Sequence, residues 1–204
     1  MEGKKDYTKE DFITNWGEGG YIETWDGHRY NWSSEIHQLI LNQIGYNKDK
    51  DVLEIGCGAG YWTNFLCEHS RNVTAIDLIP KPSINHSNFR YIENESLQFN
   101  CNTLEDESID FAFSFGVFCH FSIEACELYL QDVLRVLRTG GTAIFFYSDD
   151  KGMQEFEKDP TITASLTYGE CNNYADIMPM IRKYDPDCKK LLEFRDSLVL
   201  ITKR

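Results

Sequence analysis

The chain has 204 residues, of which 42% are hydrophobic and 14% aromatic, as expected for one folded domain with a substantial core. Its formal net charge of −13 disfavours nucleic acids and anionic membrane surfaces as partners, but it leaves room for one small nucleotide-like ligand. The seven cysteines form no CxxC pair, and the chain shows neither an apolar signal segment at its start nor a run of transmembrane length. We therefore expect a cytoplasmic protein with reduced thiols, a single domain over residues 1–204 and no membrane segment.

Residues 1–32 form a polar arm that is rich in aromatic side chains and glycines but has no regular period. Two interpretations are open, because aromatic rings supply contact area and glycines permit rearrangement. The arm either packs on the domain or forms a lid over a pocket. In the second case Tyr21 and Trp25 are candidate substrate contacts.

After the arm, apolar patterns alternate between helices and strands. The expected helices are 33–44, 60–69, 122–138 and a short one over 173–183, and the expected strands are 52–55, 72–77, 89–93, 109–115 and 142–147. Residues 190–194 and 198–202 are expected to form a closing antiparallel hairpin. This alternation predicts an α/β protein with a doubly wound, mostly parallel sheet.

The first strand ends in a glycine loop, residues 56–60, that points to a ligand. Val52–Ile55 reads as a buried parallel strand, and it breaks into Gly56, Gly58 and Gly60 before a helix. A strand that turns on glycines into a helix brings backbone close to a ligand at the carboxyl edge of the sheet. The dinucleotide pattern requires another glycine at Tyr61, and a Walker loop requires Lys-Ser or Lys-Thr after its last glycine. Phosphate cradling is therefore weakly supported.

Four ordered segments resemble those of the class I S-adenosylmethionine-dependent methyltransferases. They are Glu54–Gly60, Asp77 at the end of the next strand, Ser108–Ser114 and Val133–Gly141. The similarity runs from Asp51 to Tyr147, and Thr139 departs from it where the family usually has proline, which affects a turn and not the chemistry. The resemblance implies a Rossmann-like, seven-stranded sheet with S-adenosyl-L-methionine as cofactor. Residues 33–204 would be its core, with 149–190 a variable segment on the substrate side.

The resemblance also implies which residues hold the cofactor, and Gly56, Gly58 and Gly60 would pass backbone along its amino-acid part. Asp77 would accept both ribose hydroxyls, and Glu54 would hold the methionine ammonium. Leu78 is expected to pack on adenine, Asn94 to accept from its exocyclic amine, and Ser114 to lie on the rim. The alternatives are a solvated acid or helix cap at Asp77 and a local lysine pair for Glu54.

The methyl acceptor is less clearly indicated, and no metal is expected. His120 is the candidate base, because a pKa of about 6.5 suits proton abstraction near neutrality; the alternative is a histidine that packs or caps the next helix. Tyr147, after the apolar part of its strand, is a third candidate substrate contact. The layout is similar to that of small methyltransferases of sugar and secondary-metabolite pathways, which favours a small polar acceptor with a hydroxyl oxygen. Methyl transfer to a nitrogen of an amine, protein or RNA, or an inactive cofactor-binding subunit, are the alternatives.

Overall fold

The computed structural model describes residues 10, 33–94, 103–118, 121–148, 174–191 and 196–204. The glycine loop and all the predicted cofactor contacts lie within this part of the chain. The arm residues Tyr21 and Trp25, the candidate base His120 and residues 149–173 lie outside it.

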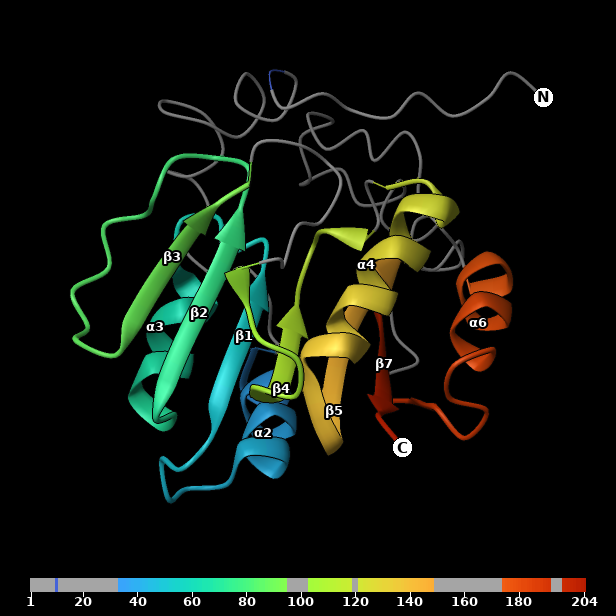
Figure 1. The fold of residues 1–204 in the computed structure, drawn as a ribbon, viewed down its shortest axis with the longest axis horizontal. Helices are drawn as coiled ribbons and strands as arrows, with labels where there is room; N and C mark the ends of the chain where they lie inside the picture. Colours follow the sequence, from blue (N-terminus) through green and yellow to red (C-terminus); the bar gives the residue numbers. More distant parts are fainter. Residues whose placement is uncertain (1–9, 11–32, 95–102, 119–120, 149–173, 192–195) are drawn as a thin grey trace, which may run out of the picture.

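One seven-stranded sheet forms the centre of the protein (Figure 1). The strands are β1 (Asp51–Ile55), β2 (Asn72–Asp77), β3 (Phe89–Glu93), β4 (Ile109–Ser114), β5 (Leu137–Ser148), β6 (Lys189–Lys190) and β7 (Asp196–Thr202). Their order is β3-β2-β1-β4-β5-β7-β6. The first five strands pair in parallel, whereas β7 pairs antiparallel with both β5 and β6. The predicted α/β fold, with a mostly parallel sheet and an antiparallel carboxyl-terminal end, is confirmed.

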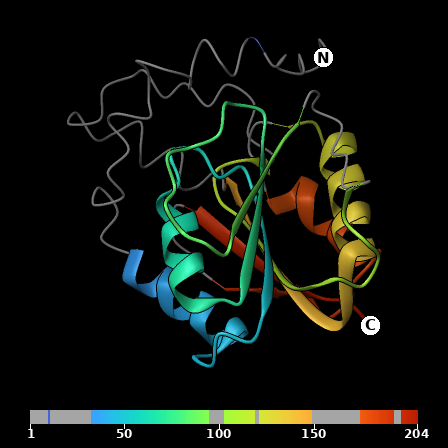
Figure 2. The same ribbon diagram turned by 60° about the vertical axis from the view of Figure 1, so that its left-hand side comes forward.

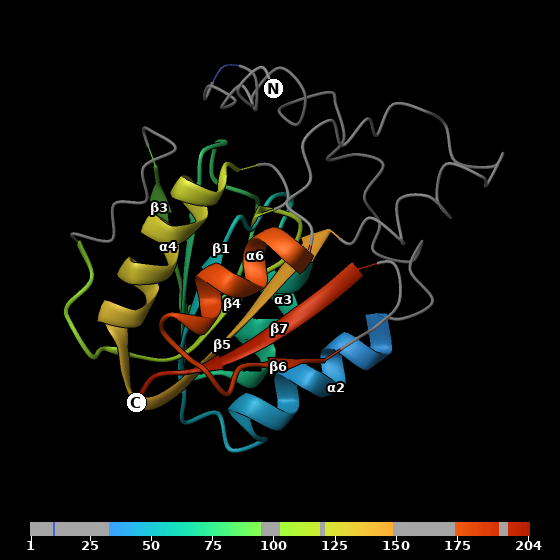
Figure 3. The same ribbon diagram turned by 90° about the vertical axis from the view of Figure 1, so that its right-hand side faces the viewer.

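Helices cover both faces of the sheet, with α2 and α3 on one face and α4 and α6 on the other (Figures 2 and 3). They are α2 (Ser33–Ile44), α3 (Tyr61–His69), α4 (Ile123–Val136) and α6 (Tyr174–Arg182). Apolar side chains fill a separate layer on each face: Ile36, Ile40, Trp62 and Leu66 on the first, and Cys126, Leu130, Val133 and Ile177 on the second. None of the helices described is both long and apolar enough to cross a bilayer.

The helix ends follow local chemistry. Ser122 caps α4, because its Oγ accepts a hydrogen bond from the Ala125 N–H at 3.2 Å. The Gly45 N–H closes the last turn of α2 on the Leu41 carbonyl at 2.8 Å. Helix α3 begins directly after Gly60 without a side-chain cap, so its first N–H groups face the glycine loop.

Several elements begin or end away from their predicted positions. Helix α4 stops at Val136 and not at 138, because Leu137 is extended with φ −64° and ψ 140°. Strand β5 therefore starts at Leu137, which pairs with Ile109 before a register irregularity, and not at 142. The predicted antiparallel pairing forms, with Lys190 opposite Val199, but β6 spans only Lys189–Lys190 and β7 begins at Asp196, inside the turn expected over 195–197. Residues 192–195 lie outside the described part of the chain.

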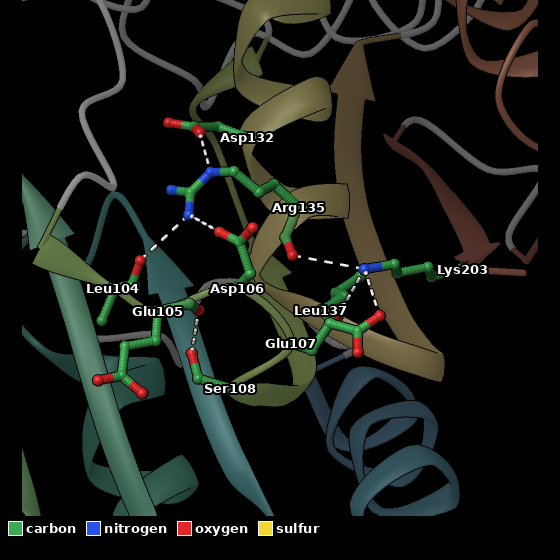
Figure 4. A network of polar contacts seen from close by, with 9 residues as sticks. All are labelled: Leu104, Glu105, Asp106, Glu107, Ser108, Asp132, Arg135, Leu137 and Lys203. Atoms are coloured by element: carbon green, nitrogen blue, oxygen red, sulfur yellow. Dashed lines mark hydrogen bonds and ion pairs between the residues drawn. The ribbon is translucent and has the colours of Figure 1, made fainter.

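Ion pairs close the edge of the sheet at which β4 and β5 begin (Figure 4). Arg135 at the end of α4 bridges Asp106, at 2.6 Å, and Asp132, at 3.0 Å. Lys203, which follows β7, pairs with Glu107 at 3.3 Å. These ion pairs connect the loop before β4, the end of α4 and the carboxyl-terminal segment, and they stabilise this edge of the sheet.

Asp51 performs the same role where β1 begins. Its carboxylate accepts from Arg71 Nε and Asn72 Nδ2, both at 2.9 Å, and from Arg138 Nη2 at 3.3 Å. The hydrogen bond from Arg71 is the main cause that lowers the pKa of Asp51 to about 2. The amino ends of the strands are thus held by charge pairs, which leaves the opposite, carboxyl edge for a ligand.

Candidate functional site

The strand register brings the predicted site residues to one edge. Ile55 at the end of β1 lies opposite Ile76 of β2 and Ser114 of β4. Asp77 ends β2, and Asn94 follows the neighbouring β3, with its N–H bonded to the Asp77 carbonyl at 2.7 Å. The glycine loop, Asp77, Asn94 and Ser114 are far apart in sequence, yet they meet at the carboxyl edge, where open α/β sheets bind ligands.

Two glycines of the loop are required by close packing, and one faces free space. A Cβ on Gly56 would lie 2.0 Å from Val117 Cγ2, and one on Gly60 would lie 2.4 Å from Ile84 Cδ1. A Cβ on Gly58 would meet nothing within 4 Å. Side chains of Val117 and Ile84 therefore pack against the loop at Gly56 and Gly60, whereas no described atom lies where a Gly58 side chain would begin.

Asp77 binds the glycine loop through its carboxylate. Its Oδ2 accepts from the Gly58 N–H at 2.7 Å, and its Oδ1 accepts from the N–H groups of Leu78, at 2.6 Å, and Ile79, at 3.3 Å. Burial raises the pKa of Asp77, and these three backbone donors offset part of the rise. Asp77 is therefore neither a solvated acid nor a helix cap: it ties the end of β2 to the loop after β1.

Two of the predicted adenine contacts flank this carboxylate. Leu78 and Asn94 are each 6% exposed, and both lie next to Asp77, one in sequence and the other through the backbone hydrogen bond from β3. Ile79 is also buried. One apolar residue and one amide residue therefore lie next to Asp77 in the chain or in the sheet, where β2 and β3 end.

Glu54 is a buried carboxyl beneath the glycine loop. It is 1% exposed, and its Oε2 accepts from Thr63 Oγ1 of α3 at 2.6 Å. Burial raises the pKa of Glu54 to about 8; the Thr63 hydroxyl opposes this rise, and the charge of Asp77 adds to it. Burial therefore favours the neutral form of Glu54, and its partner is a threonine and not the lysine considered from the sequence. A cationic ligand group arriving nearby would favour the ionised form.

The remaining predicted residues are placed less directly at this edge. Ser114 is fully buried, and its Oγ has no hydrogen-bond partner within the described part of the chain. Tyr147 is also fully buried and lines a small apolar cavity of about 10 Å³ with side chains of α4 and α6. Its assignment to substrate binding, like those of Tyr21 and Trp25, stays a prediction, and so does the assignment of His120 as the base.

The roles of two polar side chains at this site, Thr63 and Tyr91, were not predicted from the sequence. Thr63 interrupts the apolar face of α3, which is a weak signal that it serves a buried partner. Tyr91 of β3 donates its hydroxyl to the Ile79 carbonyl, and this contact follows only from the pairing of Tyr91 opposite Ala75. Both residues support groups that hold the glycine loop and Asp77.

The Glu54 pKa leads to a test of this buried carboxyl. Between its ordinary pKa of 4.5 and about 8, the unfolded chain has lost the proton that the folded chain keeps, so rising pH lowers stability. Glu54→Gln removes this dependence, and we expect the variant to gain about 1.4 kcal/mol over the wild type per pH unit across that window. Urea unfolding of both proteins at several pH values measures the difference. Parallel stability profiles would show that Glu54 does not titrate in this window.

Sequence comparisons point to a methyl-transfer enzyme family. Residues 53–145 match the model of a methyltransferase domain. A probable S-adenosylmethionine-dependent methyltransferase of Mycobacterium tuberculosis is 32% identical over 108 residues, which are 52% of this chain and 38% of the relative. The malonyl-[acyl-carrier protein] O-methyltransferase of Priestia megaterium is 40% identical over 63 residues, 28% of this chain and 23% of the relative. The chain thus spans less than two fifths of the length of these two relatives.

The fold agrees with these matches. The N-methyltransferase NodS of Bradyrhizobium japonicum, solved with S-adenosyl-L-homocysteine, superposes with a TM-score of 0.64 at 17% identity, covering 88% of this chain and 91% of NodS. The seven-stranded, mostly parallel sheet and the glycine loop before Asp77 are those implied by the sequence resemblance. The family-model match, the relatives and the fold together support a class I S-adenosylmethionine-dependent methyltransferase.

Proposed function

We propose that the protein transfers a methyl group from S-adenosyl-L-methionine to a hydroxyl oxygen of a small polar acceptor. The observation that carries the cofactor half of this proposal is the carboxylate of Asp77, bonded to the Gly58 N–H at 2.7 Å at the carboxyl edge of β1 and β2. This hydrogen bond places a carboxylate next to glycine backbone. A carboxylate can accept from the ribose diol of the cofactor, and glycine backbone allows close approach of its amino-acid tail.

In the proposal, separate residues at this edge contact the ribose, the adenine and the amino-acid tail of the cofactor. In the proposal Asp77 accepts from the ribose hydroxyls through its two carboxylate oxygens, which also accept from three backbone N–H groups and from the Cys57 side chain. Leu78 packs on the adenine and Asn94 accepts from its amine. The backbone at Gly58 faces the amino-acid tail, with the buried Glu54 behind it as the group that ionises toward the ammonium.

The proposed chemistry needs positioning and one base. S-adenosylmethionine supplies a methyl group already activated by its sulfonium, and an in-line displacement moves that group to the acceptor oxygen. His120, on the segment after β4, takes the hydroxyl proton as the oxygen attacks. Tyr21, Trp25 and Tyr147 are proposed to contact the acceptor. An oxygen acceptor agrees with the O-methyltransferase among the relatives, and the net charge of −13 disfavours an RNA acceptor.

The proposed function is tested by calorimetric titration with S-adenosylhomocysteine, followed by methyl-transfer assays across hydroxyl and amine acceptors. We expect cofactor binding and turnover on a hydroxyl acceptor. In His120→Ala, turnover should fall about 100-fold or more while the affinity for S-adenosylhomocysteine is unchanged, because only the base is lost.

The outcomes of this experiment are distinct. A protein that binds a nicotinamide dinucleotide in place of S-adenosylhomocysteine contradicts the cofactor assignment. Turnover on amines alone replaces the oxygen acceptor by nitrogen. Cofactor binding without turnover on any acceptor supports an inactive binding subunit.

A matched pair of glycine variants separates backbone strain from ligand contact. Gly58 and Gly45 both have positive φ, +50° and +70°, and a Cβ on either meets nothing within 4 Å. Alanine at each position should therefore cost a similar amount of stability, about 1–2 kcal/mol. Only Gly58→Ala puts a methyl group where the amino-acid tail of the cofactor is proposed to pass. This variant should therefore weaken S-adenosylhomocysteine binding at least about tenfold, whereas Gly45→Ala should not. Equal affinities of the two variants would show that the cofactor does not pass over Gly58.

A further inference from the structure

We propose that Tyr91 is a positioning residue for the cofactor: its hydroxyl fixes the turn that presents Asp77 and Leu78. The inference rests on the proposed function, because it concerns how this edge holds an adenosyl group. It adds a residue from within β3 to a site otherwise built from the ends of β1, β2, β3 and β4.

The Tyr91 hydroxyl lies at the turn that follows β2. Tyr91 is opposite Ala75 in the parallel pairing of β2 with β3, so its side chain runs beside the end of β2. Its OH donates to the Ile79 carbonyl, and the Asp77 carbonyl lies 3.5 Å from the same oxygen. One phenol therefore reaches the backbone on both sides of Leu78, the residue proposed to pack on adenine.

The turn contains a second, complementary set of bonds. Asp77 Oδ1 accepts from the N–H groups of Leu78 and Ile79, which folds the turn from the inside. The Asn94 N–H holds the Asp77 carbonyl from β3 at 2.7 Å. Tyr91 supplies the donor for the Ile79 carbonyl. The N–H groups of the turn are therefore bonded to the Asp77 carboxylate, and its carbonyls are bonded to donors from the β3 segment.

The hydroxyl is well suited to remain a donor. Burial, and then the nearby charge of Asp77, raise the pKa of Tyr91 far above its usual value, so the phenol stays protonated at any physiological pH. Ile79 is buried, and a buried carbonyl that loses its donor is destabilised unless the backbone moves. Without the Tyr91 hydroxyl, the turn is expected to shift or loosen, and with it the direction of the Asp77 carboxylate and the Leu78 side chain.

A positioning role predicts a specific pattern of affinity loss. Tyr91→Phe removes one oxygen and keeps the ring. It should weaken binding of S-adenosylhomocysteine about fivefold or more, and binding of methylthioadenosine, which has the adenosine half alone, by the same factor. The KM for S-adenosylmethionine should rise in parallel, while kcat at saturating cofactor stays unchanged, because the reacting atoms are not touched.

Tyr184→Phe is the matched control. Its hydroxyl donates to Glu127 Oε1 at 2.9 Å and accepts from Gln131 Nε2 at 2.7 Å, on the outer side of α4 and away from the glycine loop. Both variants lose a bonded tyrosine hydroxyl, so a general effect on folding should appear in both. Only Tyr91→Phe should alter ligand affinity and speed amide hydrogen exchange at residues 78 and 79.

The experiment consists of calorimetric titration of wild type and both variants with each ligand, together with amide exchange without ligand. Equal affinities of wild type and Tyr91→Phe for methylthioadenosine overturn the inference, as does unchanged exchange at residues 78 and 79. A wild type that binds neither ligand contradicts the proposed function itself, which is a different result. Loss of affinity for S-adenosylhomocysteine alone would place the effect at the amino-acid tail and would also overturn the inference.

Discussion

The architecture of the candidate site depends on one carboxylate, that of Asp77. Parallel pairing puts the ends of β1 and β2 next to each other, but it does not fix the chain that leaves them. Asp77 does so by accepting from the Gly58 N–H on one oxygen and from Leu78 and Ile79 on the other. The glycine loop, the turn after β2 and, through Asn94 and Tyr91, the end of β3 are thereby held as one unit.

The two edges of the sheet are stabilised by different means, and this difference explains why the carboxyl edge suits a ligand. At the amino edge, Asp51, Arg135 and Lys203 pair with groups supplied by the chain itself. At the carboxyl edge, Glu54 and Asp77 are held by backbone N–H groups and by the hydroxyl of Thr63, and no lysine or arginine among the described residues forms an ion pair with either. Negative and neutral acceptors at this edge suit a ligand that brings its own donors and positive charge.

The sequence was sufficient to predict the site wherever the signal was local. Glycines after an apolar run and an acid at the next strand end place the loop and Asp77, since parallel strands finish at one edge. Thr63 and Tyr91 were not found, because their roles arise from tertiary pairing. The buried face of α3 likewise depends on its neighbours: Thr63 and Cys67 face the core, whereas Phe65 and His69 are only half-buried. His37 of α2 stacks on Phe65, with ring centroids 4.0 Å apart.

The most direct test of the role of Asp77 is a crystal structure of the protein with S-adenosylhomocysteine. We predict both ribose hydroxyls within hydrogen-bond distance of the Asp77 carboxylate, the adenine against Leu78 and the amino-acid tail over Gly58. A ligand bound elsewhere on the sheet, or one whose ribose makes no contact with Asp77, would contradict this role.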